Sequence, residues 1–164
     1  MSVYLVLIAG LCTSSSAAVL IRLCDAPSLV IAAYRLGISS LILIPLAAFR
    51  TPTGLRELLS SHCITVLGSG FCLAFHFSFW ITSLRHTSVA VSVFLVNTAP
   101  LMVALFSFLL WRERLTFTGA AGIVVAVSGT GCLSLEQFQS SGTLAGALYA
   151  LLGALFLSVY LTAG

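Results

Sequence analysis

Long apolar segments occupy almost all of the 164-residue chain, and short polar segments separate them. Each apolar segment is about 20 residues long, and a helix rising about 1.5 Å per residue then crosses a hydrocarbon core of about 30 Å. The pattern therefore predicts an all-α membrane protein, an antiparallel bundle of transmembrane helices. Six helices are predicted, over residues 3–21, 28–49, 64–84, 89–110, 117–135 and 144–164.

The polar connections are about 4 to 14 residues long, which leaves no room for a soluble domain. In the longest connection, Pro52 and Gly54 interrupt the helical pattern, and we expect a short amphipathic turn at the membrane interface. The last apolar segment reaches Gly164 without a flanking charge. We therefore expect the sequence to be cut within a repeated unit.

Composition excludes whole classes of protein. Hydrophobic residues make up 60% of the chain and charged residues 7%, whereas about a quarter of the residues in soluble domains are charged. The net charge of +3 is spread thinly along the chain, so no nucleic-acid partner is expected. The expected surroundings are a lipid bilayer.

Arginines in the connections predict the orientation. The connections after the second and fourth spans carry more arginines than the others, which predicts a cytoplasmic amino terminus in a multi-pass protein of the cytoplasmic (inner) cell membrane. The residues concerned are Arg50, Arg56, Arg112 and Arg114 on one side, against Arg22 and Arg85 on the other.

Arg35, beside Tyr34, is the strongest polar signal inside a span. It lies about 10 Å along the second helix, at about 1.5 Å per residue, and a buried charge is costly in a bilayer. Two interpretations remain open. The guanidinium reaches back to the interface, where it pairs with Asp25, or it contacts an anionic or zwitterionic substrate.

The third span carries a polar and aromatic face. Ser69, Cys72, His76, Trp80 and Ser83 recur at spacings of three and four residues, so they share one side of a helix. We expect this side to line the bundle interior, with His76 and Trp80 as candidate substrate-binding residues. The alternatives are a hydrogen bond from His76 to a neighbouring helix and an interfacial anchor at Trp80.

In the fourth span, Ser92, Asn97 and Pro100 interrupt an apolar run. Pro100 has no N–H for the Val96 carbonyl, so it predicts a kink that frees this carbonyl for a neighbour or a ligand. Ser92 and Asn97 add polar groups near the kink and are further binding candidates. The alternative is a kink that serves packing alone.

Small residues form faces on the last two spans. Gly119, Gly122, Ala126 and Gly129 share one side of the fifth span, and Gly146, Ala150 and Gly153 share one side of the sixth. Small side chains let helix backbones approach closely in membranes. We therefore expect both faces to form packing contacts.

Several patterns argue against enzymatic, metal and cofactor chemistry. The chain has no Cys-x-x-Cys pair, so no metal site and no cofactor are predicted. Ser69 and His76 lie about 10 Å apart along the helix axis, too far for a serine nucleophile and its base. No Asp or Glu falls inside a predicted span, so proton coupling through a membrane carboxylate is not expected. The sequence therefore predicts no enzyme and no catalytic residue.

Four segments, in order and at matching separations, resemble the EamA repeat of the drug/metabolite transporter superfamily. The resemblance covers residues 3 to about 135. The segments are Ala26-Pro-Ser-Leu-Val-Ile-Ala-Ala-Tyr-Arg35, Trp80-Ile-Thr-Ser-Leu-Arg-His-Thr-Ser-Val-Ala-Val-Ser92, Thr98-Ala-Pro-Leu-Met-Val-Ala104 and Glu113-Arg-Leu115.

This resemblance implies a ten-helix secondary transporter made of two five-helix repeats, the second inverted relative to the first. Residues 1–135 would be the first repeat, and 136–164 a linker and the first helix of a truncated second repeat. Arg35 and Pro100 are similar to the family's helix 2 arginine and helix 4 proline, and Glu113 with Arg114 to its structural and topological signature. Residues 13–16 read Thr-Ser-Ser-Ser where the related small multidrug resistance proteins use a glutamate.

The resulting hypothesis is a carrier that exports a small polar, amino-acid-like metabolite by alternating access, with a cavity between the first four spans. Two alternatives stay open. One is a helical membrane scaffold or regulatory protein without transport. The other is a short half-transporter that works as a dimer, with a second copy in place of the missing repeat.

Overall fold

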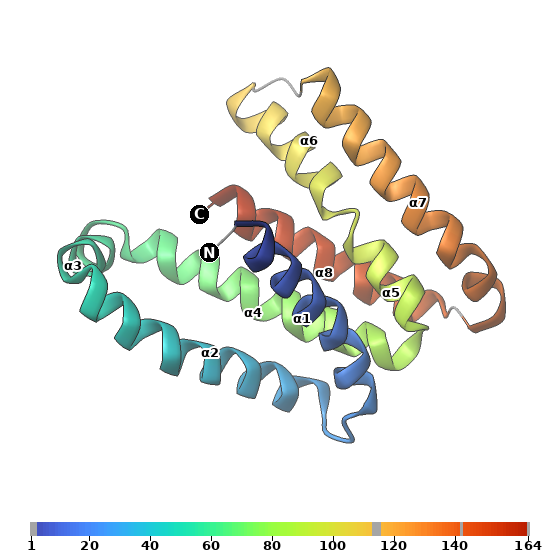
Figure 1. Cartoon of the computed structure of the whole chain (residues 1–164), viewed down its shortest axis with the longest axis horizontal. Helices are drawn as coiled ribbons and strands as arrows, with labels where there is room; N and C mark the ends of the chain where they lie inside the picture. Colours follow the sequence, from blue (N-terminus) through green and yellow to red (C-terminus); the bar gives the residue numbers. More distant parts are fainter. Residues whose placement is uncertain (1–2, 113–115, 142, 164) are drawn as a thin grey trace.

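The computed structural model describes residues 3–112, 116–141 and 143–163, and every regular element in these ranges is a helix. The predicted all-α membrane fold is therefore confirmed. In chain order the helices are α1 (Val3–Leu23), α2 (Ser28–Arg50), α3 (Pro52–Ser61), α4 (Cys63–His86), α5 (Val89–Val96), α6 (Ala99–Trp111), α7 (Phe117–Ser141) and α8 (Leu144–Ala163) (Figure 1).

Five stretches in the described residues are long and apolar enough to cross a membrane: α1, α2, α4, α5 together with α6, and α8. The remaining predicted span corresponds to the apolar start of α7, Phe117–Cys132, which is shorter. At about 1.5 Å per residue this stretch measures about 24 Å, less than a typical hydrocarbon core. The helix itself continues to Ser141, beyond the predicted end at residue 135.

The connection between α2 and α4 is a ten-residue helix, α3, where a short turn was predicted. Pro52 occupies its first turn, and there the missing N–H costs no helical hydrogen bond. Proline thus ends α2 and also begins α3.

The fourth span is divided into α5 and α6 at Asn97 and Thr98. Pro100 lies in the first turn of α6, where its fixed φ suits a helix start. The Thr98 hydroxyl donates a 2.6 Å hydrogen bond to the Leu95 carbonyl and so satisfies part of the interrupted backbone. Because Pro100 cannot donate to Val96, the break falls just before the proline instead of bending the helix at it.

Helix α8 lies at the centre of the bundle and packs along α4, with α5 and α6 beside it (Figure 1). Its buried face consists of small residues, among which Ala150 and Ala154 are fully buried. A Cβ added at Gly153 would lie 3.3 Å from the Trp80 backbone nitrogen, so glycine allows the two backbones to approach closely. The predicted small-residue face of this span is therefore a packing surface.

Most of the small-residue face predicted for the fifth span forms no contact with the other described helices. Gly122, Ala126 and Gly129 in α7 are exposed, and no side chain lies within 4 Å of the position of a Cβ at Gly122 or Gly129. Helix α7 instead packs on α5 through a face that includes Gly131, against the Phe94 ring.

One end of the bundle is tied by hydrogen bonds to backbone carbonyls. The Arg85 guanidinium donates to the carbonyls of Cys24 and Ala26 in the α1–α2 connection. Arg22 donates to the Thr87 carbonyl over 3.2 Å. We call this end, where α1 and α4 finish and α8 begins, the Arg85 end.

The start of α8 is also held at the Arg85 end. The Thr143 hydroxyl donates to the His86 carbonyl and accepts from the Gly146 backbone N–H. A Cβ at Gly146 would lie 2.7 Å from the Thr87 Cβ and 2.8 Å from the His86 carbonyl carbon. Only glycine fits this contact.

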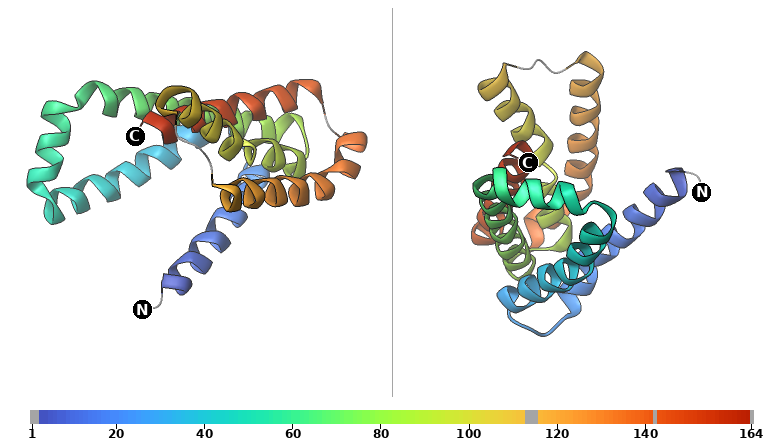
Figure 2. Two further views of the ribbon diagram at one scale, coloured as in Figure 1. Left: turned by 90° about the horizontal axis from the view of Figure 1, so that it is seen from above. Right: turned by 90° about the vertical axis from the view of Figure 1, so that its left-hand side faces the viewer.

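At the opposite end, which we call the α3 end, the helices separate. The amino-terminal half of α1 leaves the bundle, and α6 and α7 diverge from the pair formed by α4 and α8 (Figure 2). An apolar cavity of about 380 Å³ lies there between α6 and α8. The molecule is thus closed at one end and open at the other.

Candidate functional site

A cavity of about 430 Å³ lies between α1, α2, α4, α5 and α8, beside the break before α6. We call it the Arg35 cavity. Its walls come from helices far apart in the chain, so it exists only in the assembled bundle. Its polar and aromatic lining consists of Ser14, Ser15, Arg35, His76, Phe77, Trp80 and Asn97.

Arg35 enters this cavity from α2. Its guanidinium carbon lies 4.7 Å from the centroid of the Phe77 ring and 5.6 Å from that of Trp80, which are cation–π distances. Within the described part of the chain no acidic side chain forms an ion pair with it, and Asp25 in particular does not. The aromatic rings of α4 therefore position the charge.

His76 is 5% exposed and bridges α4 to α8. Its Nδ1 lies 2.8 Å from the Gly153 carbonyl oxygen. A carbonyl only accepts, so Nδ1 carries the proton, and in the neutral ring Nε2 is an acceptor. The hydrogen bond to a neighbouring helix, one of the two interpretations of His76, is thus formed, and the same side chain also lines the Arg35 cavity.

The Trp80 ring stacks on His76, with centroids 6.0 Å apart and planes inclined by 6°. The indole Nε1–H is buried and has no hydrogen-bond partner among the described residues. Trp80 also lines the cavity. Its Nε1–H, however, lies in the packed interior out of reach of solvent.

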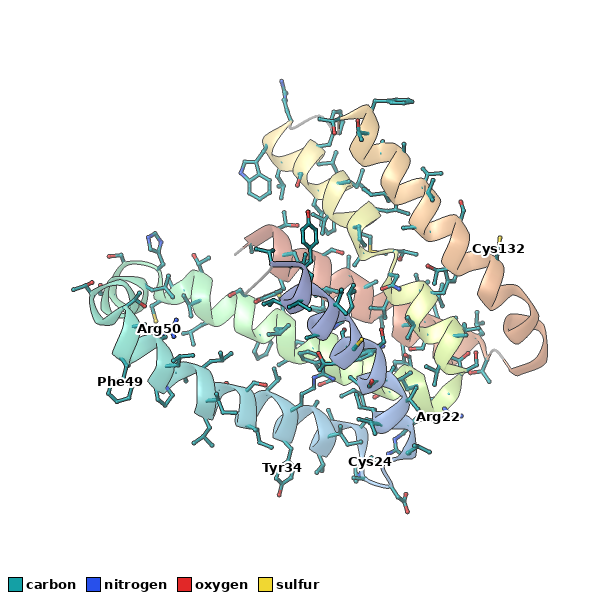
Figure 3. The ribbon with its side chains drawn as sticks, in the orientation of Figure 1. Arg22, Cys24, Tyr34, Phe49, Arg50 and Cys132 are labelled. Carbon is teal, nitrogen blue, oxygen red and sulfur yellow. The ribbon has the colours of Figure 1, made fainter. Side chains whose placement is uncertain are left out.

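Some of the other predicted site residues line the cavity, and others lie away from it. Asn97 lies at the α5–α6 break and lines the cavity. Ser92 is fully buried away from it, with its hydroxyl 2.5 Å from the Ser83 hydroxyl. Tyr34 is 68% exposed and points away from the bundle (Figure 3). Pro100 is exposed in the first turn of α6, outside the cavity lining.

Glu113 and Arg114, predicted as a structural signature, lie outside the described residues. The cavity is also lined by four residues that were not predicted as site residues: Ser14, Ser15, Phe77 and Leu157. The serine run in the otherwise apolar first span was the available signal for the two serines. Phe77 and Leu157 carry no such signal, because apolar residues line lipid, packing contacts and cavities alike.

A second cavity, of about 610 Å³, lies at the α3 end between α3, α4 and α8. We call it the α3-end cavity. His62, Thr65 and Ser69 of α4 and its cap line it, with Tyr160 from α8. At 100° per residue, about the step of an α-helix, these α4 residues share the face of His76 and Trp80. The two cavities therefore follow one another along the same side of α4.

Comparison with known proteins identifies the family of the chain. The uncharacterized transporter YxxF of Bacillus subtilis (strain 168) is 31% identical over 100 residues, which are 57% of this chain. The matched segment spans 31% of that relative, less than a third of its length. No solved structure matches the chain. Residues 1–135 match the profile of the EamA-like transporter family, and the chain therefore belongs to this family of membrane transporters.

Proposed function

We propose that this chain supplies the substrate-binding half of a carrier for a small polar metabolite, with the Arg35 cavity as its binding site. The observation that supports this most directly is the convergence of Arg35, His76, Trp80 and Asn97 on one cavity between membrane-spanning helices. Polar side chains inside a membrane are energetically costly, and those that occur there commonly bind a partner or a ligand. The volume of the cavity lies in the range of about 300 to 1,000 Å³ that is usual for small-molecule sites.

Alternating access is supported by the difference between the two ends of the bundle. The Arg85 end is tied by hydrogen bonds from Arg22, Arg85 and Thr143. At the α3 end, the second cavity leads along α4 toward the first. We infer that a substrate reaches the Arg35 cavity from the α3 end in this conformation.

The direction of transport rests on the arginine distribution. If the amino terminus and the α3 end are cytoplasmic, as the positive-inside rule predicts, this conformation is open to the cytoplasm and collects a substrate for export. The complete carrier then requires a second half, either an inverted second repeat that begins with α8 or a second copy of the chain.

The test is ligand binding by the full-length protein in detergent, followed by transport in proteoliposomes. Amino acids, nucleosides and nucleotides are screened for a shift of the thermal unfolding midpoint, and active compounds are tested for counterflow. We expect at least one class to bind and to be transported. His76→Gln and Asn97→Ala should weaken binding, while Tyr34→Phe, which lies away from the cavity, should leave it unchanged.

A protein that binds none of these compounds, with His76→Gln and Asn97→Ala as stable as the unmodified protein, would instead support the scaffold or regulatory alternative.

A further inference from the structure

The charge of the Arg35 cavity is not balanced by the chain around it. Arginine remains protonated under all ordinary conditions. The spans α1, α2, α4, α5 with α6, and α8 contain no Asp or Glu at all. Among the described residues, Arg35 is the charged side chain that lines the cavity. A single positive charge therefore stands in a membrane-embedded site, where an uncompensated charge is expensive.

Its contacts hold the guanidinium but leave its donors unused. The faces of Phe77 and Trp80 attract the cation, yet a ring face occupies none of the five N–H groups as a carboxylate would. No hydrogen bond from Arg35 is formed within the described part of the chain. Arg22 and Arg85, by contrast, donate to backbone carbonyls at the Arg85 end.

Trp80 supplies a second observation about the same wall of the cavity. Its ring lines the cavity and lies 5.6 Å from the guanidinium carbon, while its Nε1–H is buried out of reach of solvent. The ring therefore helps to hold the guanidinium in place, and the positive charge at this wall comes from Arg35.

We propose, building on the function proposed above, that the Arg35 cavity binds a substrate through a carboxylate group, with Arg35 as its ion-pairing partner. One cation matches one monovalent anion, whereas a phosphate dianion requires further positive groups that the described lining does not contain. The rest of the substrate faces the other polar lining groups, His76 Nε2 as an acceptor and Asn97 as donor and acceptor.

The test compares acids with their carboxamides, which keep the shape and lose the negative charge of the carboxylate. Common amino acids and their carboxamides are measured against the full-length protein by thermal shift and equilibrium binding, with uncharged nucleosides as a contrast. We expect acids to bind about tenfold or more tightly than the matching amides, because a charged hydrogen bond is lost in the amide. In Arg35→Gln this preference should fall to about one.

Arg35→Lys, which keeps the charge and loses the planar donor fork, should retain a part of the preference. A purely structural role of Arg35 would lower the affinity for both ligand types equally. Unfolding midpoints of the ligand-free variants show whether each one is folded.

The outcomes separate the two proposals. Equal or tighter binding of amides or nucleosides, or an unchanged acid preference in Arg35→Gln, would overturn the carboxylate assignment and leave the carrier function standing. If the unmodified protein binds no compound of any class, both proposals fail together.

Discussion

At the scale of single residues, the contact at Gly146 controls how closely α8 approaches the connection between α4 and α5. Its backbone N–H is bonded to Thr143, which is bonded in turn to the His86 carbonyl. The backbone on the other side, around His86 and Thr87, cannot move aside as a flexible side chain can. The position therefore tolerates hydrogen and nothing larger.

Gly146→Ala should destabilise the protein by about 1–3 kcal/mol, the usual cost of overpacking a close contact. Its Cβ would lie 2.7 Å from the Thr87 Cβ, so the start of α8 must shift. The measurement is thermal unfolding in detergent. Gly122→Ala is the matched control, because its Cβ meets nothing within 4 Å and the helix gains in propensity. Equal stability of the two variants would contradict this account of the contact.

At the scale of helices, the spans could be predicted from the sequence, but their partners could not. A run of about 20 apolar residues is a local signal, which is why five spans coincide closely with the predicted ranges. Packing faces and lipid faces in a membrane are both apolar, so hydropathy does not distinguish them. The small residues of α8 face α4, while Gly122, Ala126 and Gly129 of the similar set in α7 are exposed.

Sequence also could not distinguish the predicted site residues that line the cavity from those that do not, because this depends on how the helices pack. Arg35 and Tyr34 are adjacent in the sequence, yet one enters the cavity and the other points outward. Ser92 and Asn97 lie near the same break, yet Ser92 bonds to Ser83 instead. A polar residue in a span predicts that something must satisfy it. Whether a neighbouring helix or a cavity does so depends on the assembled bundle.

The break between α5 and α6 allows a test at this scale. Pro100→Ala restores an N–H that can bond to the Val96 carbonyl, which favours one continuous helix and moves Asn97. We expect ligand affinity to fall several-fold while thermal stability is kept or increased. Pro45→Ala is the control, because Pro45 lies inside α2 with an exposed side chain and outside both cavities. A similar loss of affinity in both variants would argue against a role of the break in binding.

At the scale of the whole molecule, the bundle is closed at the Arg85 end and open at the α3 end. At the closed end, Arg22 and Arg85 donate hydrogen bonds to backbone carbonyls in the connections between helices. These hydrogen bonds can break without unfolding a helix. The open end holds the larger cavity. This asymmetry supports the proposal of alternating access, in which one of two gates is shut at a time.

Thiol labelling would locate the open side. In a variant without the native cysteines, Thr65→Cys and Ser69→Cys should react with a membrane-impermeant thiol reagent, because both positions line the α3-end cavity. Phe71→Cys is the control: this side chain is 67% exposed but does not line that cavity, so lipid should protect it. Labelling from the cytoplasmic side of oriented vesicles is expected. Equal labelling of all three positions would contradict this account, because the cavity positions would then be no more accessible than the control.

The hydrogen bond between His76 and Gly153 has a consequence for synthesis on the ribosome. Helix α8 is made after every other described helix, yet it completes the centre of the molecule. A nascent chain that has emerged only as far as α7 leaves the imidazole without its acceptor and the α4 backbone without its closest neighbour. The earlier helices must therefore remain in the bilayer or the translocon without their central partner. The bundle is completed when α8 inserts between them.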